Sequence, residues 1–348
     1  MVRRSRFGVA AISFAAALPL LLSGSAHAAV PTYEFVTPLF GLAAAPNGNL
    51  FAADAGQGVV KLTADAGSLF AKLRGVDDVA PLGNGRLLAI TGGGPKARDA
   101  SLYRVVGGRK QRIASLGAYE AAKNPDGGEI DSNPFGVAAL GANKVLVADA
   151  AGNSVLHVNA NGRVNWVATL PDELAPTDNA KQLAGCPDAP PDFAFVCDLP
   201  DMIPGQAVAT SVAVGPDGAW YAGELRGFPA PTGMSKVWRI EPGTRHAHCG
   251  SDPRCTVAFD GFTSIVDLSF TPDGTLLVTE IDEASWLALE AGSGSKGGSV
   301  NACQLGGYCT KVAKDLPMPT ASTSGAGGQL YAAIWGLVPG SAEVIEIP

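Results

Sequence analysis

Charged side chains are scarce in this sequence. They make up 16% of its 348 residues, against about 25% in average globular chains. Glycine, by contrast, is abundant, with 44 residues. Low charge and much glycine suit short strands and tight turns better than long helices that face solvent. The composition therefore favours a fold built from β-strands.

A basic patch is also missing. The net charge is −7, and the acidic residues form no long run. Phosphate-rich partners require clustered Lys and Arg side chains. The sequence therefore gives no support for binding to nucleic acid or to an anionic membrane, whereas a neutral or cationic ligand remains compatible with its charge.

Two common catalytic motifs are absent. The glycine-rich stretch Gly92–Lys96 lacks the spacing and the Ser or Thr of a phosphate-binding loop. No Gly-x-Ser-x-Gly nucleophile elbow occurs anywhere in the chain. The sequence thus identifies no catalytic residue by motif.

A convincing membrane span is missing as well. The apolar stretch Phe7–Leu22 is shorter than the ~20 apolar residues that a span needs, and it contains Pro19. Three arginines precede this stretch and small residues ending at Ala28 follow it, as in a cleavable signal peptide. An uncleaved anchor is the alternative, and the export route, general secretory or twin-arginine, stays open. We expect residues 1–28 to be a signal peptide and residues 29–348 to be one secreted or periplasmic domain without a membrane span.

The cysteines occur as three pairs that are close in sequence. In an oxidising compartment such pairs are expected to form local disulfides that staple loops. Metal binding around His246–Cys249 is the rival, but this stretch lacks a second recognisable ligand pair. We predict the disulfides Cys186–Cys197, Cys249–Cys255 and Cys303–Cys309.

An internal repeat is the most informative pattern in the chain. Residues 39–62 and 133–158 both run from Phe-Gly through a small apolar segment and a Gly/Asn turn to an apolar strand that ends in Ala-Asp. Six copies of that second strand occur, at residues 49–54, 86–91, 144–149, 219–224, 275–280 and 329–334. An apolar third segment follows each copy, and Trp286–Glu290 is the third segment of the fifth unit. Six units of about four short strands predict an all-β fold, a six-bladed β-propeller.

The two ends of the chain suggest how the ring closes. The sixth unit stops at Pro348 after its third strand, and Tyr33–Leu39 reads as a fourth strand with no unit before it. We predict that Tyr33–Leu39 pairs beside Ala342–Pro348 in one blade, which would remove an open sheet edge.

Loops of a propeller that follow second and fourth strands share one face, here called the loop face. The longest irregular segments fall on it, at residues 117–132, 171–209 and 225–235, whereas the first-to-second turns are all tight. Because function in rigid scaffolds tends to reside on such loops, we expect a ligand site on the loop face. His157, His246 and His248 fall in third segments or opposite-face loops, so no histidine base is expected there.

An acidic residue closes the second strand in four of the six units. Each carboxylate can accept backbone N–H bonds from its own loop, or the four together can hold a hard divalent cation such as Ca²⁺, with help from Asn133 and Asp267. We take Arg226 and Phe228 as exposed neighbours. The metal candidates are Asp54, Asp149, Glu224 and Glu280, and the ligand-binding candidates are Asp54, Asp149, Glu224, Arg226, Phe228 and Glu280.

Four phrases resemble the ScyD/ScyE family of exported NHL-like propeller proteins. They are GGEIDSNPFGV (127–137), SVAVGPDGAWYAGELRGFPAPTG (211–233), KVWRIEPG (236–243) and GFTSIVDLSFTPDGTLLVTEI (261–281). The resemblance covers nearly the whole chain after residue 28 and implies an exported six-bladed propeller that assists secondary-metabolite or pigment maturation. It brings no catalytic residues. The family's Phe-Pro-Phe-Pro run is Phe228-Pro229-Ala230-Pro231 here, with one aromatic ring fewer.

We expect a monomeric binding or accessory protein that takes a small molecule or a protein partner on its loop face, ahead of any catalytic role. One alternative is a divalent-metal-dependent hydrolase that resembles lactonase-type propellers, although the Asn pair of those enzymes is not evident. A second alternative is a structural module associated with a cell wall or matrix.

Overall fold

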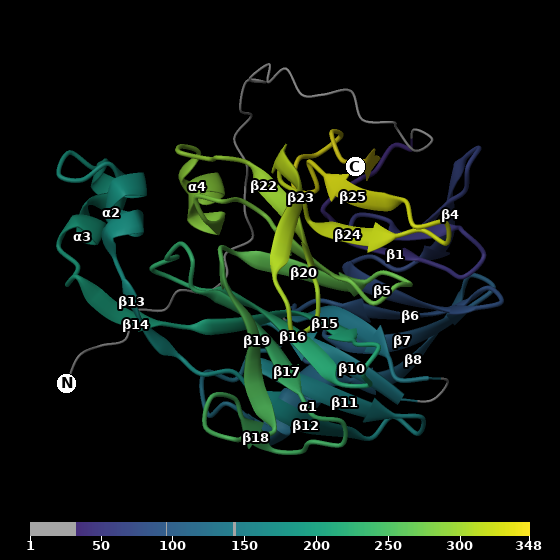
Figure 1. Ribbon diagram of the computed structural model, residues 1–348. Helices are drawn as coiled ribbons and strands as arrows, with labels where there is room; N and C mark the ends of the chain where they lie inside the picture. Colours follow the sequence, from purple (N-terminus) through teal and green to yellow (C-terminus); the bar gives the residue numbers. More distant parts are fainter. Residues whose placement is uncertain (1–32, 95, 142–143) are drawn as a thin grey trace.

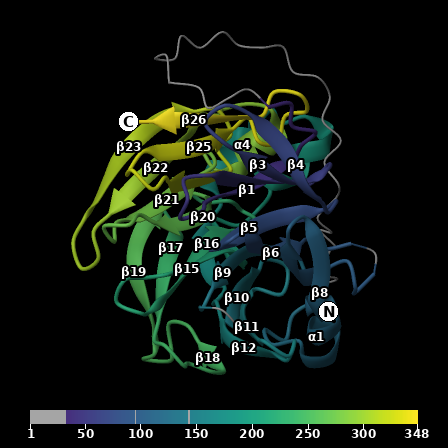
Figure 2. The same cartoon turned by 90° about the vertical axis from the view of Figure 1, so that its right-hand side faces the viewer.

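The computed structural model describes residues 33–94, 96–141 and 144–348. The predicted signal peptide, residues 1–28, lies outside them. Six small antiparallel sheets form a ring (Figures 1 and 2), and their first strands pack against one another in a closed cycle, β1, β5, β9, β15, β20, β24 and back to β1. The predicted six-bladed β-propeller is confirmed.

The blades are numbered here in chain order. Blade 1 contains β1 (Leu39–Ala44), β2 (Leu50–Asp54), β3 (Gly58–Leu62) and β4 (Gly67–Lys72). Blade 2 contains β5 (Val76–Gly83), β6 (Arg86–Thr91), β7 (Ser101–Val106) and β8 (Arg109–Ser115). Blade 3 contains β9 (Pro134–Ala139), β10 (Lys144–Asp149), β11 (Ser154–Asn159) and β12 (Val164–Thr169), and β18 (Ala247–His248) joins its outer edge.

The second half of the ring is built in the same way. Blade 4 contains β15 (Ala207–Val214), β16 (Trp220–Arg226), β17 (Ser235–Ile240) and β19 (Cys255–Phe262). Blade 5 contains β20 (Ile265–Phe270), β21 (Leu276–Glu280), β22 (Gly298–Cys303) and β23 (Cys309–Leu316). Blade 6 contains β24 (Ala321–Ser324), β25 (Leu330–Ile334) and β26 (Glu343–Ile347).

The hydrophobic core lies between the blades. One apolar cluster fills each of the six interfaces between neighbouring sheets. Side chains of a strand alternate between its two faces, so Leu50 and Ala52 of β2 contact blade 6 while Phe51 and Ala53 contact blade 2. Because both faces are buried, the central residues of the second strands are mostly apolar or small, and this pattern made the strands recognisable in the sequence.

The predicted closure of blade 6 by Tyr33–Leu39 is wrong. Among the described residues β26 pairs only with β25, and the sheet of blade 6 has three strands. The N–H groups of Val36 and Thr37 bond to Asp54 instead, and Pro38 has no N–H to offer a strand partner. The segment still helps to join the ends of the ring, because Phe35 is buried in the cluster between blades 1 and 6.

The predicted third strand of blade 5 is also wrong. Trp286–Glu290 belongs to a short helix, α4 (Trp286–Ala291), and the third strand is β22, further along the chain. The helix ends at Gly292, which adopts a positive φ of 64°, a conformation that glycine accepts without strain. The connection between β21 and β22 is therefore a long helical excursion.

Two further connections between strands contain helices that lie outside the blades. Helix α1 (Leu116–Lys123) lies in the link between blades 2 and 3. The link between blades 3 and 4 forms an insertion that contains β13 (Glu173–Pro176), α2 (Asp178–Ala184), the 3₁₀ helix Pro191–Phe193, α3 (Ala194–Cys197) and β14 (Met202–Gly205). This insertion stands to the left of the ring in Figure 1.

The three predicted disulfides are confirmed: Cys186–Cys197 within the insertion, Cys249–Cys255 in blade 4 and Cys303–Cys309 in blade 5. None of the helices in the described ranges is long and apolar enough to cross a membrane.

Candidate functional site

A broad groove of about 3260 Å³ opens on the loop face. Its walls come from the insertion, from residues 126–131 and 225–228, from α4 with residues 292–297, and from residues 335–341. These segments follow second or fourth strands, and the sequence predicted a ligand site on loops of this kind. The groove offers a ligand a wide concavity on this face.

The floor of the groove is made by bulges in the first strands. In β9, β15 and β20 an extra residue interrupts the pairing with the second strand, and these residues, Phe135, Thr210 and Val266, line the groove. A bulge re-aims a side chain relative to the regular alternation of a strand. The bulge residue of β1, Phe40, packs edge to face against Phe135 with 5.2 Å between ring centroids. Rings from blades 1 and 3 thus meet near the axis of the propeller.

Aromatic and aliphatic side chains continue up one wall. Leu225, Trp286 and Met318 pack on a small buried cluster around Val266 and also line the groove. The indole N–H of Trp286 donates to the carbonyl oxygen of Arg226 at 2.9 Å, which holds the ring in place. The groove therefore presents a preformed apolar surface.

The charged residues of the groove are mostly acidic. Among the residues that the structure describes, eight carboxylate side chains line it, whereas Lys296 and His248 are the lining side chains with basic groups. A site with this balance favours ligands that carry positive charge or hydrogen-bond donors. The acidic lining residues are Asp126, Glu129, Asp131, Asp172, Glu173, Glu290, Asp315 and Glu343.

The structure places Asp54 and Asp149 in backbone-anchoring roles. Asp54 accepts bonds from the N–H groups of Val36, Thr37 and Gly56. Asp149 accepts bonds from the Ser132 hydroxyl and from the backbone of the loops beside it, and its carboxyl is fully buried. Burial raises the pKa of Asp149 to about 6, although these hydrogen bonds act in the opposite direction.

Glu224 and Glu280 are likewise held by nearby groups. Glu224 pairs with Arg226 and accepts a 2.5 Å bond from the indole N–H of Trp238, yet burial raises its pKa to about 7. Glu280 accepts bonds from the Thr263 N–H and from the Asn301 amide at 2.7 Å. Among the residues the structure describes, no three His, Cys, Asp or Glu side chains are grouped for a metal ion. The four second-strand carboxylates are thus not brought together at one point.

The expected exposure of Arg226 is wrong. Its side chain is buried, and its guanidinium donates to the carbonyl oxygens of Pro171 and Gly205, at 3.1 Å each, as well as to Glu224. Arg226 thereby ties the base of the insertion to blade 4. Of the six ligand-binding candidates, Phe228 alone is among the described residues that line the groove.

Two first-strand aspartates connect neighbouring blades. Asp78 of β5 accepts the N–H of Val137 in blade 3 at 2.7 Å, and Asp267 of β20 accepts the N–H of Ser322 in blade 6 at 2.9 Å. Burial, followed by the negative charge of Asp267, raises the pKa of Asp78 well above its usual value, and burial raises that of Asp267 to about 6. Asn133, the other suggested helper, accepts the N–H of Gly93 at 2.7 Å.

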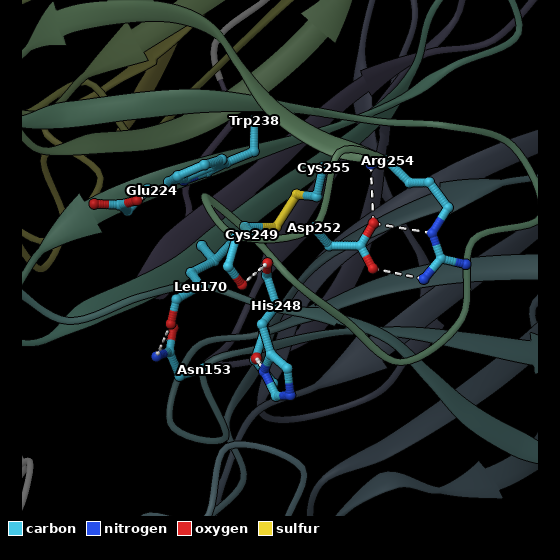
Figure 3. The surroundings of a disulfide bond; sticks show 11 residues. Asn153, Leu170, Glu224, Trp238, His248, Cys249, Asp252, Arg254 and Cys255 are labelled. Carbon is cyan, nitrogen blue, oxygen red and sulfur yellow. Dashed lines mark hydrogen bonds and ion pairs between the residues drawn. A yellow bond between two sulfur atoms is a disulfide. The ribbon is translucent and has the colours of Figure 1, made fainter.

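Sequence reasoning missed His248. The strand β18 pairs in parallel with β12, so Ala247 and His248 lie beside Ala168 and Thr169 at the edge of blade 3. Figure 3 shows this loop around the Cys249–Cys255 disulfide, with the His248 ring directed away from the disulfide. The ring Nδ1 lies 2.8 Å from the Thr169 hydroxyl, and His248 lines the groove. One hint in the sequence that His248 could reach this position was the length of the connection between the third and fourth strands of blade 4.

The sequence matches no known family model and no curated protein. Solved structures do match the fold. A protein of unknown function from Bacteroides thetaiotaomicron aligns over 93% of this chain and 72% of its own, with TM-score 0.55 and 13% identity. A PQQ-bound aldose sugar dehydrogenase from Streptomyces coelicolor aligns over 92% and 96%, with TM-score 0.55 and 10% identity. A gluconolactonase from Xanthomonas campestris aligns over 91% and 88%, with TM-score 0.51 and 11% identity. At these identities the similarity extends to the propeller fold alone.

Proposed function

We propose that this protein binds a small molecule with an aromatic or apolar body in the loop-face groove. The observation that carries the proposal is the apolar floor formed by Phe135 and Val266 beside Trp286 and Leu225. Apolar surface with a few placed polar groups is typical of small-molecule sites. The acidic lining adds a preference for ligands with a positive charge or several hydrogen-bond donors.

The resemblance to the ScyD/ScyE family agrees with this proposal. An accessory protein in secondary-metabolite or pigment maturation would hold an aromatic intermediate, and such a molecule suits the aromatic side chains of the groove. The three disulfides are consistent with a periplasmic or extracellular protein. Binding without turnover is the role that we propose.

A fluorescence titration tests the proposal, because Trp286 and Trp335 line the groove. We expect cationic aromatic amines to change the tryptophan emission and to bind more tightly than neutral sugars or aromatic acids. Phe135→Ala is expected to weaken the binding about 10-fold, since stacking and burial against one ring contribute roughly 1–2 kcal/mol.

Tyr308→Ala is the matched control. Tyr308 is 74% exposed and lies in the turn between β22 and β23, on the opposite face. Its loss should leave the affinity unchanged. If none of the amines binds, or if Phe135→Ala and Tyr308→Ala have equal effects, the groove is not the ligand site.

A metal-dependent lactonase-like hydrolase is a weaker candidate. The fold is shared with a gluconolactonase, but Glu224 and Glu280 are already held by nearby side-chain and backbone donors rather than directed to a common point. Incubation with a panel of lactones, with and without added divalent metal, tests this candidate. Metal-dependent ring opening that is lost in Glu224→Gln would favour it over binding alone.

A further inference from the structure

Unpartnered oxygen atoms gather where helix α1 meets blade 3. In the described part of the chain, seven buried side-chain polar atoms have no hydrogen-bond partner, and five of them belong to four residues at this junction. All five are oxygens: both carboxylate oxygens of Glu120, Oδ1 of Asn124, Oδ1 of Asn153 and Oγ of Ser154. Buried polar groups are nearly always paired, so such a concentration requires an explanation.

Glu120 is the centre of this group. Its side chain is 1% exposed, and no described donor reaches either carboxylate oxygen. An added Cβ on Gly152 would lie 3.0 Å from Glu120 Oε2 and 3.3 Å from the carboxyl carbon of Asp149. The two carboxyl groups therefore flank the same point of the loop between β10 and β11.

The amide oxygens come from both sides of this junction. Asn124 is the C-cap of α1, and its backbone N–H donates to the carbonyl oxygen of Glu120 one helical turn earlier. Asn153 directly follows Gly152, and its amide N–H donates to the carbonyl oxygen of Leu170 at 3.0 Å (Figure 3). That bond fixes the side chain and leaves its Oδ1 as a free acceptor.

We propose that this junction is a Ca²⁺ site in which Glu120, the side-chain oxygens of Asn124 and Asn153, and Oδ2 of Asp149 surround the ion. Oδ2 accepts a single hydrogen bond, from the Ser132 hydroxyl, whereas Oδ1 accepts two. Ca²⁺ prefers carboxylate and amide oxygens in irregular arrangements. A divalent cation bound here would compensate the charge of both neighbouring carboxylates and would also give the unpartnered oxygens a partner. The amide ligands also explain why a grouping of three His, Cys, Asp or Glu side chains is not found here.

The surroundings of the junction agree with a bound cation. The carboxylates of Asp149, Asp126 and Asp131 lie near enough to Glu120 to add negative charge around it. Asn153, Asp126 and Asp131 line the groove, so an ion can enter from solvent. A bound ion would fasten the link between blades 2 and 3 against the wall of the groove. The site does not depend on which ligand the groove takes.

Calcium analysis and thermal unfolding of the full exported chain test the site. We expect one Ca²⁺ per chain, either present as purified or bound when CaCl₂ is added back after dialysis against EDTA. The melting temperature should rise by roughly 5 °C once free Ca²⁺ exceeds its Kd about 100-fold. Absence of calcium from the purified protein together with no shift at about 10 mM CaCl₂ would overturn the proposal, because even weak extracellular sites are filled at that level.

Three variants connect any Ca²⁺ effect to this junction. Glu120→Gln keeps the side-chain size and should abolish the calcium-dependent rise. Asn124→Gly removes one oxygen at a position with φ of 40°, which glycine accepts, and should weaken Ca²⁺ binding about 10-fold in a calorimetric titration. Glu290→Gln, on α4, is the control and should retain the full rise. A rise that persists in Glu120→Gln, or an unchanged Kd in Asn124→Gly, would refute the assignment.

Discussion

Replacing Arg226 with methionine should destabilise the protein severely, and the structure allows the size of the effect to be worked out. The buried guanidinium neutralises Glu224 and donates to two backbone carbonyl oxygens of the insertion. Without it, the indole N–H of Trp238 is the remaining donor to a fully buried carboxylate. Breaking a buried ion pair by removal of one partner costs about 3–5 kcal/mol. Because each kcal/mol shifts the melting temperature of a large domain by about 2–4 °C, we expect a loss of roughly 6–20 °C.

The pH dependence makes this prediction specific. Burial already raises the pKa of Glu224 to about 7 with Arg226 present, and removal of the positive charge should raise it further. A carboxyl with a raised pKa in the folded state holds a proton that the unfolded state has released, so stability falls as pH rises through that window. Arg226→Met should therefore lose more stability at pH 8 than at pH 6.

Urea unfolding of a set of variants is the assay. Glu224→Gln/Arg226→Met removes both charges and should be less destabilised than Arg226→Met, with little pH dependence between pH 6 and pH 8. Arg226→Lys should lie between the wild type and Arg226→Met, because it keeps the charge and loses the forked geometry. If Arg226→Met and the double variant unfold at the same urea concentration at both pH values, the buried pair is not what stabilises this region.

Three further predictions concern the ring and the insertion. Burial raises the pKa of Asp77 to about 8, so its contribution to stability should decrease as pH rises from about 4 to 8, and Asp77→Asn should flatten the pH profile of urea unfolding. Phe35→Ala should cost about 3–5 kcal/mol in the same assay, because the ring is 4% exposed between blades 1 and 6; a cost below about 1 kcal/mol would contradict this packing role. Replacing Cys186 and Cys197 with serine should increase proteolysis within the insertion and leave the main thermal transition nearly unchanged, because the insertion has a small core of its own.

Most of the propeller could be predicted because its strongest signals are local and repeated. A second strand lies between two interfaces, so its central residues are mostly apolar or small, and a glycine-containing turn precedes it. The two errors arose where local pattern is ambiguous. Five apolar-rich residues at Trp286–Glu290 fit a strand or a helix equally well, and the glycine at 292, which ends α4, was the signal for a helix. In Tyr33–Leu39, Pro38 argued against a paired strand.

The candidate site was harder to predict because it depends on contacts between distant segments. Asp54, Asp149 and Glu280 were correctly placed at strand ends, whereas β16 continues past Glu224 to Arg226. A sequence cannot show that donors such as the Asn301 amide already occupy these carboxylates. The burial of Arg226 depends on carbonyl oxygens of the insertion, more than 20 residues earlier in the chain. The apolar floor depends on bulges, and a bulge is a property of strand pairing that has no fixed sequence pattern.

One signal for that floor was nevertheless present in the sequence. The repeated units of blades 1 and 3 both begin with Phe-Gly, and the structure gives each residue of the pair a separate role. The phenylalanines occupy bulges, where Phe40 and Phe135 contact each other near the ring axis. The glycines allow close approach of other blades: a Cβ on Gly41 would lie 2.4 Å from a carboxylate oxygen of Asp78, and one on Gly136 would lie 2.7 Å from Cα of Ser211. Alanine at either glycine should therefore force neighbouring blades apart, whereas alanine at either phenylalanine should open the floor of the groove and leave the ring intact.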